Sequence, residues 1–262
     1  MTILDKIIAR KIEEVAERKL QVSIKELEMK GYFAKITNSL KTSLLNPASR
    51  GIIAEFKRKS PSKGIINANV ILEDVTRGYV QAGAACLSVL TDIDFFGGSD
   101  DDFLRARKAN PSIPMIRKDF MIDEYQIIES KSLGADVILL IAANLSPLKI
   151  RELGKLTKEL GMETLLEIHD EEELNRSFCE YIDVVGVNNR NLKNFSEQNV
   201  NASLELVDKI PTNCIKISES CISNIETINI LKSVGYKGFL MGEIFMKTDN
   251  PAKALADLIT GL

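Results

Sequence analysis

The chain has 262 residues, 45% of them hydrophobic and 27% charged, with a net charge of −3. This composition is that of an ordinary soluble protein and argues against a general binder of nucleic acid or of membrane surfaces, so any basic site must be local. The N-terminus lacks the apolar segment of a signal peptide, and the four cysteines have no C-x-x-C spacing, which indicates reduced thiols. We therefore expect a cytoplasmic protein without nucleic-acid or membrane partners, as a monomer or a weak homo-oligomer.

Residues 1–50 are expected to form helices that lie outside the pattern of the rest of the chain. Six aliphatic residues fall on one helical face, namely Ile3, Leu4, Ile7, Ile8, Ile12 and Val15. Ser23 and Glu26 have the spacing of a capping box that begins a second helix. We interpret this segment as a helical extension that packs on the main body through its aliphatic stripe. A separate partner-binding helix is the less favoured reading.

Eight apolar runs of strand length follow residue 50. They are centred near Ile53, Leu87, Met115, Leu139, Leu165, Val185, Ile217 and Leu240. The runs do not alternate with polar residues, which indicates strands buried on both faces, as in a parallel sheet. Helical patterns, several ending at a glycine, fill the gaps between them. Eight such units predict an α/β fold, a (β/α)8 barrel over residues 51–262, with a doubly wound sheet as the alternative. We expect residues 1–262 to form a single domain.

Polar residues follow six of the apolar runs, and the carboxyl ends of barrel strands are where such proteins place their active sites. The residues that stand there include Glu55, Lys57, Lys118, Glu167, Asn188, Arg190, Glu219 and Glu243. Glu55 and Lys57 share the parity of Ile53, so both should point into the barrel. A lysine and a glutamate crowded there either hold each other ionised or, if desolvated, shift their pKa values, which suits acid–base catalysis. The alternative is an ion pair whose two charges only neutralise each other and take no part in catalysis.

Metal and thiol chemistry find little support. His169 is the only histidine, so a site built on it would lack nitrogen partners, and no cysteine stands beside a base. The acids of residues 100–102 are interpreted as the first turn of a helix rather than as Mg²⁺ ligands. Phosphate is better supported, because the loops after the seventh and eighth strands, "SESCISN" and "MGEIFMK", are the habitual phosphate site of these barrels. Ser220 can add a hydroxyl there, and Gly242 permits a close backbone approach.

Eight segments, taken together and in this order, resemble one family. They are "IIAEFKRKSPSKG", "FFGGS", "IRKDF", "ADVILLI", "LLEIHDEEEL", "VGVNNRNL", "ISES" and "GFLMGEIFMK". The chain is similar in these segments to indole-3-glycerol phosphate synthases. The resemblance implies closure of an indole ring on a phosphorylated small-molecule substrate, 1-(2-carboxyphenylamino)-1-deoxyribulose 5-phosphate, with loss of CO₂ and water. It also implies that no cofactor and no metal take part.

The resemblance also implies roles for individual residues. The residue matching Lys118 is the general acid, and the one matching Glu167 is a general base or polarises the anilino nitrogen. Those matching Glu55 and Lys57 assist dehydration and help to hold the charged groups of the substrate.

Further roles concern the sugar and the phosphate. Residues matching Asn188 and Arg190 position the sugar hydroxyls and the catalytic side chains. The remaining substrate contacts, including the phosphate end, are expected at Ser60, Glu219, Ser220, Cys221, Gly242 and Glu243.

One position departs from the family pattern. Cys221 stands where the family usually has glycine, and a side chain there costs about 1 kcal/mol if the backbone has a positive φ. We expect a functional enzyme with an altered phosphate loop. Two other readings remain open at this point: another sugar-phosphate isomerase, epimerase or aldolase on the same barrel, and a binding protein that uses "KRKSPSK" as a nucleic-acid or localisation signal.

Overall fold

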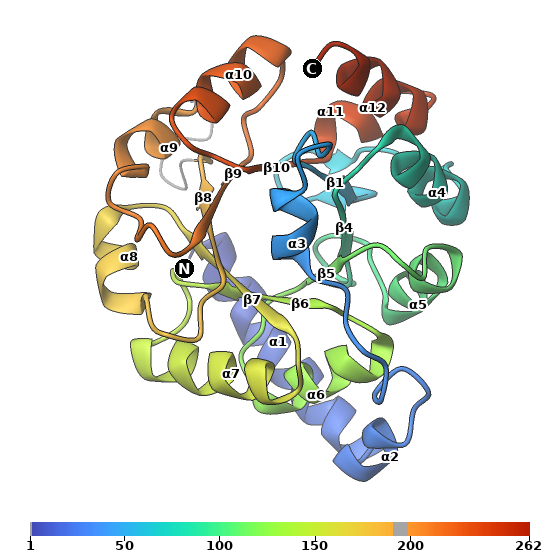
Figure 1. Cartoon of the computed structure of the whole chain (residues 1–262). Helices are drawn as coiled ribbons and strands as arrows, with labels where there is room; N and C mark the ends of the chain where they lie inside the picture. The colour runs from blue at the N-terminus through green and yellow to red at the C-terminus, as the bar shows by residue number, and fades with distance from the viewer. Residues whose placement is uncertain (1, 191–198) are drawn as a thin grey trace.

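Eight parallel strands form a closed barrel in this computed structural model, which describes residues 2–190 and 199–262 (Figure 1). The strands are β1 (Ile52–Phe56), β4 (Cys86–Leu90), β5 (Met115–Lys118), β6 (Val137–Ile141), β7 (Glu163–Ile168), β8 (Val184–Asn188), β9 (Ile215–Glu219) and β10 (Gly238–Met241). The first strand pairs with both β4 and β10, which closes the ring. The predicted barrel is therefore confirmed, and the doubly wound sheet is excluded.

Helices form an outer layer around the barrel (Figure 1). They are α4 (Leu72–Ala82), α5 (Asp100–Ala109), α6 (Glu124–Leu133), α7 (Pro147–Glu159), α8 (Glu171–Ser177), α9 (Asn201–Leu206), α10 (Ile225–Ser233), α11 (Glu243–Met246) and α12 (Pro251–Thr260). Gly83 and Gly134 end α4 and α6 with φ angles of 101° and 88°. This agrees with the glycines that the sequence places at the ends of the helical patterns. Across residues 2–190 and 199–262, no helix combines the length and the apolar surface that crossing a membrane requires.

The N-terminal extension contributes three helices, which reach both ends of the barrel. They are α1 (Ile3–Gln21), α2 (Ile24–Glu28) and α3 (Leu40–Leu45). Leu40 and Leu44 of α3 are buried in the same cluster as the side chains inside the barrel, at the amino ends of the strands. Helix α1 lies at the opposite end, so that the two helices are on the near and far sides of the barrel in Figure 1.

The aliphatic stripe of α1 is only partly buried, which corrects the expectation drawn from it. Ile7 and Val15 are buried, but Ile3 is 39% exposed and Ile12 is 58% exposed. The side chains buried beside Ile7 and Val15 on this helix are charged rather than aliphatic. The helix is therefore attached through a polar seam, because its partners in the barrel loops are carboxylates.

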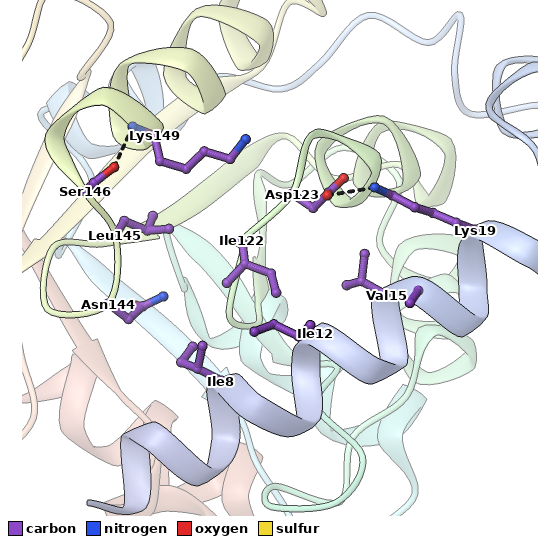
Figure 2. A pocket seen from close by; sticks show the side chains of 11 residues that line it. Ile8, Ile12, Val15, Lys19, Ile122, Asp123, Asn144, Leu145, Ser146 and Lys149 are labelled. Atoms are coloured by element: carbon purple, nitrogen blue, oxygen red, sulfur yellow. Dashed lines mark hydrogen bonds and ion pairs between the residues drawn. The ribbon is translucent and has the colours of Figure 1, made fainter. Parts of the chain in front are cut away.

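Ile8, Ile12 and Val15 of α1 border an open cavity of about 590 Å³. Figure 2 shows Ile8 and Ile12 facing Ile122 and Leu145 across this space. The cavity lies beside α1 and the starts of α6 and α7, against the loops that follow β5 and β6, and its lining includes none of the site residues that the sequence predicts.

Candidate active site

The first strand ends in an inward-facing ion pair. Lys57 Nζ lies 2.5 Å from Glu55 Oε1, and both side chains are largely buried. Arg58, which has the opposite parity, donates to Asp102 at the start of α5 at 2.6 and 3.0 Å. Lys59 donates to the carbonyl of Asp94 at 2.9 Å. The basic segment is therefore committed to contacts within the protein, which removes the basis for reading it as a nucleic-acid or localisation signal.

A second cluster joins the ends of four strands around Lys118. Its Nζ lies 2.8 Å from Glu167 Oε2 and 3.3 Å from Glu219 Oε2. Asn188 at the end of β8 donates to the other oxygen of Glu167 at 3.0 Å. The barrel supplies this convergence, since residues that lie far apart in the sequence leave β5, β7, β8 and β9 at the same end.

The electrostatics of this cluster separate its two carboxylates. Burial opposes the charge on Lys118, but Glu167 and Glu219 outweigh it and raise the pKa of the lysine well above its usual value. Burial also works against ionised Glu167, yet the lysine lowers the pKa of that carboxyl to about 2. Burial, opposed by Lys118 but reinforced by the charge of Glu167, raises the pKa of Glu219 to about 7. Near neutral pH, Glu167 is therefore ionised, whereas Glu219 exchanges between its protonated and its ionised form.

Gly186 makes room for Glu219 and was missed by sequence reasoning. A Cβ atom at this position of β8 would lie 2.2 Å from Glu219 Oε1. That oxygen is buried and has no hydrogen-bond partner in the described part of the chain. A signal was available, because a lone glycine inside the apolar run "VVGVN" marks a close approach of another group to the backbone.

The loop after β1 folds into a small hairpin, β2 (Lys59–Ser60) and β3 (Gly64–Ile65), that meets the ends of other strands. Arg190, after β8, donates to Ser62 Oγ at 2.9 Å, and its Nη2 lies 3.6 Å from Glu243 Oε2. The Ser60 hydroxyl is buried without a partner among the described residues. Arg190, Ser60 and Glu243 thus gather at one rim. Residues 191–192, which close the "VGVNNRNL" segment, lie outside the described residues.

The loop after β9 has an unusual backbone. Ser220 and Cys221 have φ angles of 65° and 58°, in the left-handed region that favours glycine. The condition under which the Cys221 side chain costs stability is therefore met. The neighbouring strand β10 is followed by Gly242, where a Cβ atom would lie 2.8 Å from Glu55 Cβ. The two loops that the sequence indicates for phosphate therefore follow neighbouring strands, close to the Glu55 pair.

His169 stands between two carboxylates. Its Nδ1 lies 3.1 Å from Glu173 Oε2, and its Nε2 lies 3.9 Å from Glu167 Oε1. Within residues 2–190 and 199–262, no group of three or more histidine, cysteine or acidic side chains is arranged to hold a metal ion. The absence of a metal from the reaction stays a prediction.

Comparisons with known proteins agree with this geometry. A family model described as indole-3-glycerol phosphate synthase matches residues 4–258. Among solved structures, the chain is similar to 3-hexulose-6-phosphate synthase, with 13% identity and a TM-score of 0.61 over 81% of this chain and 99% of the other. It is also similar to N-acetylmannosamine-6-phosphate 2-epimerase from Clostridium perfringens, with 15% identity and a TM-score of 0.56 over 81% and 93% of the two chains. At these identities the two structures show the fold alone.

Proposed function

The chain belongs to the indole-3-glycerol phosphate synthase family, and we propose that Lys118 and the carboxylates around it carry out the proton transfers of that reaction. The enzyme is a carboxy-lyase that converts 1-(2-carboxyphenylamino)-1-deoxyribulose 5-phosphate into indole-3-glycerol phosphate, CO₂ and water. This assignment decides against the other sugar-phosphate reactions that the same barrel can support.

The reaction needs an acid at the sugar ketone and a base for the carbon-bound proton that leaves during dehydration. As the aromatic carbon attacks the ketone carbon, the ketone oxygen takes a proton, for which Lys118 is the proposed donor. The carboxylate then leaves as CO₂, and its bonding electron pair restores the aromatic ring. Loss of the new hydroxyl as water needs a second proton on that oxygen and removes one proton from the methylene carbon beside the anilino nitrogen, because the indole product keeps its N–H. Glu167 is the proposed acceptor of that proton. Lys57, paired with Glu55 at 2.5 Å, is proposed to share the dehydration.

The contacts of Lys118 carry this proposal. Its ammonium is held by Glu167 at 2.8 Å and by Glu219 at 3.3 Å, which ensures that it is protonated before substrate binds. A ketone oxygen that displaces one of these carboxylates accepts a hydrogen bond from Lys118 and weakens the field that holds its proton. Substrate binding therefore turns a strongly protonated lysine into a better acid.

The phosphate is proposed to lie at the loops after β9 and β10. Ser220 and Cys221 support this through their left-handed backbone, and Gly242 supports it by permitting a close approach of the main chain. Ser60 and Arg190 are proposed to contact the rest of the substrate, because they lie at the neighbouring rim.

Three further properties are proposals. We infer that residues 1–50 and 51–262 act as a single domain, because α1 and α3 contact both ends of the barrel. A cytoplasmic location is supported by four free cysteines. We also propose that the protein is a monomer or a weak homo-oligomer and that it needs no cofactor. Sedimentation of the purified protein measures its oligomeric state.

The test is turnover of Lys118→Ala, followed by the fluorescence of the indole product. The chain has no tryptophan, so the protein itself contributes little background. We expect a folded variant whose kcat falls by about 10²–10⁴-fold, the range that a positioned acid supplies. Near-normal turnover would remove Lys118 as the acid.

A further inference from the structure

A buried lysine of the N-terminal helix lies next to the strand that carries the proposed acid. Lys11 in α1 has a side chain that is only 1% exposed. Its Nζ lies 2.9 Å from Asp119 Oδ1, 3.1 Å from Asp92 Oδ2 and 2.8 Å from Glu14 Oε2. An ammonium has three N–H donors, and here each has a carboxylate partner. Such a charge is withdrawn from water only at a large desolvation penalty, which full pairing of this kind offsets.

The carboxylates that face Lys11 fix the ends of two barrel strands. Asp119 directly follows Lys118, and it also accepts a hydrogen bond from Thr91 Oγ1 at 2.6 Å. Asp92 follows β4 and accepts from the backbone N–H of Phe95 at 2.9 Å, which holds the loop beyond that strand. One ammonium therefore ties α1 to the neighbouring strand ends of β4 and β5.

The residue on the other side of Lys118 is fixed in the same outer layer. Arg117 is buried and pairs with Glu129 of α6 at 2.8 Å and with Asp100 of α5 at 3.0 Å. Side chains alternate along a strand, so Arg117 and Asp119 point outward while Lys118 points into the barrel. Both chain neighbours of the acid are thereby anchored by charge, and the direction of its own side chain follows from theirs.

We propose that Lys11 is a positioning residue for the reaction, acting through Asp119 on the backbone that aims Lys118 at the substrate. The inference rests on the proposed function, because it takes Lys118 as the acid. Without the ammonium, α1 no longer holds Asp119, which keeps Arg117 Nη2 at 3.6 Å as its cationic partner, and the end of β5 is free to shift. The phosphate loops follow β9 and β10, on other strands of the barrel, so substrate binding is left nearly unchanged.

The test compares Lys11→Met with a matched variant of the same helix. Lys19→Met removes an exposed lysine that pairs with Asp123 at 2.7 Å, and it serves as the control. We expect Lys11→Met to lower kcat by about 10–100-fold, as misplacement of a catalytic group by about 1 Å does, with KM changed less than twofold. Lys11→Arg, which keeps the charge, should recover most of kcat. Each kcat is measured at a temperature where circular dichroism shows the variant fully folded.

A second variant keeps the test decisive if Lys11→Met fails to fold. Lys11→Met combined with Asp92→Asn removes one cation and one anion, so no additional charge is left buried without a partner. We expect this variant to fold and still to show the selective loss of kcat. A folded variant of either kind with the kcat of Lys19→Met, or with a raised KM and normal kcat, overturns the positioning role. Turnover of Lys118→Ala is measured in parallel. If it is lost, the proposed function stands even where the positioning role of Lys11 is overturned.

Discussion

Gly186→Ala should disturb the active site by a displacement that the structure defines. The added Cβ would lie 2.2 Å from Glu219 Oε1, whereas ordinary contacts begin at 3.4 Å, so the carboxylate must withdraw by about 1.2 Å. Glu219 contacts Lys118 at 3.3 Å, and a shift of this size breaks that contact or pulls the lysine with it. Misplacement of a reacting group by about 1 Å costs on the order of 10²-fold in rate. We therefore expect kcat/KM to fall by about that factor.

The effect on stability should be smaller. An extra methyl group in a packed interior costs about 1–3 kcal/mol, from which about 0.5–1 kcal/mol is recovered because alanine loses less backbone entropy than glycine in a strand. Thermal unfolding and product fluorescence measure the two effects separately. Gly31→Ala is the matched control, because a Cβ atom there meets nothing within 4 Å. A folded Gly186→Ala enzyme with unchanged kcat/KM would show that the position of Glu219 does not matter.

Two further predictions concern the loop after β9 and the single histidine. Cys221→Gly should change Tm by no more than a few degrees, because about 1 kcal/mol of relieved strain at φ 58° is offset by the entropy of glycine. It should lower the substrate KM, whereas an inactive wild type rescued by this change would contradict our reading of the loop. Burial opposes protonation of His169, but Glu173 and Glu167 outweigh it and raise the pKa of the ring above 6.5. His169→Gln should therefore destabilise the protein below pH 6.5, and the difference should vanish as pH rises through the raised pKa. NMR titration of this lone imidazole checks the value directly, and a pKa at or below 6.5 refutes the argument.

The barrel could be predicted from the sequence because a parallel sheet leaves a strong local signal. Strands buried on both faces are apolar throughout, as "VILLI" of β6 is, and glycines such as Gly134 end the helices between them. The ends of these runs also located Glu55, Lys118 and Glu167, since the fold gathers all carboxyl ends on one side. Whether those residues perform the roles that the family resemblance implies stays a prediction.

The pairings within the site and on α1 could not be predicted, because they depend on residues far apart in the sequence. Lys11 and Ile12 are neighbours on one helix, yet the lysine is buried and the isoleucine is 58% exposed. Hydrophobicity alone predicts the reverse. Only the positions of Asp92 and Asp119, about a hundred residues away in the chain, make the buried lysine favourable. In the same way, the parity of β1 indicated that Glu55 and Lys57 share a face, but not which carboxylates would surround Lys118.

The closure of the barrel by α3 sets the order in which the chain can assemble. Leu44 is synthesised before every strand of the barrel, but it packs beside Gly238 at the start of the last strand. Contacts of such long sequence separation carry a high loop-closure entropy and form late in folding. Until β10 emerges from the ribosome, Leu40 and Leu44 have no finished interior to enter. Helix α3 is therefore made before the barrel strands and secured after them.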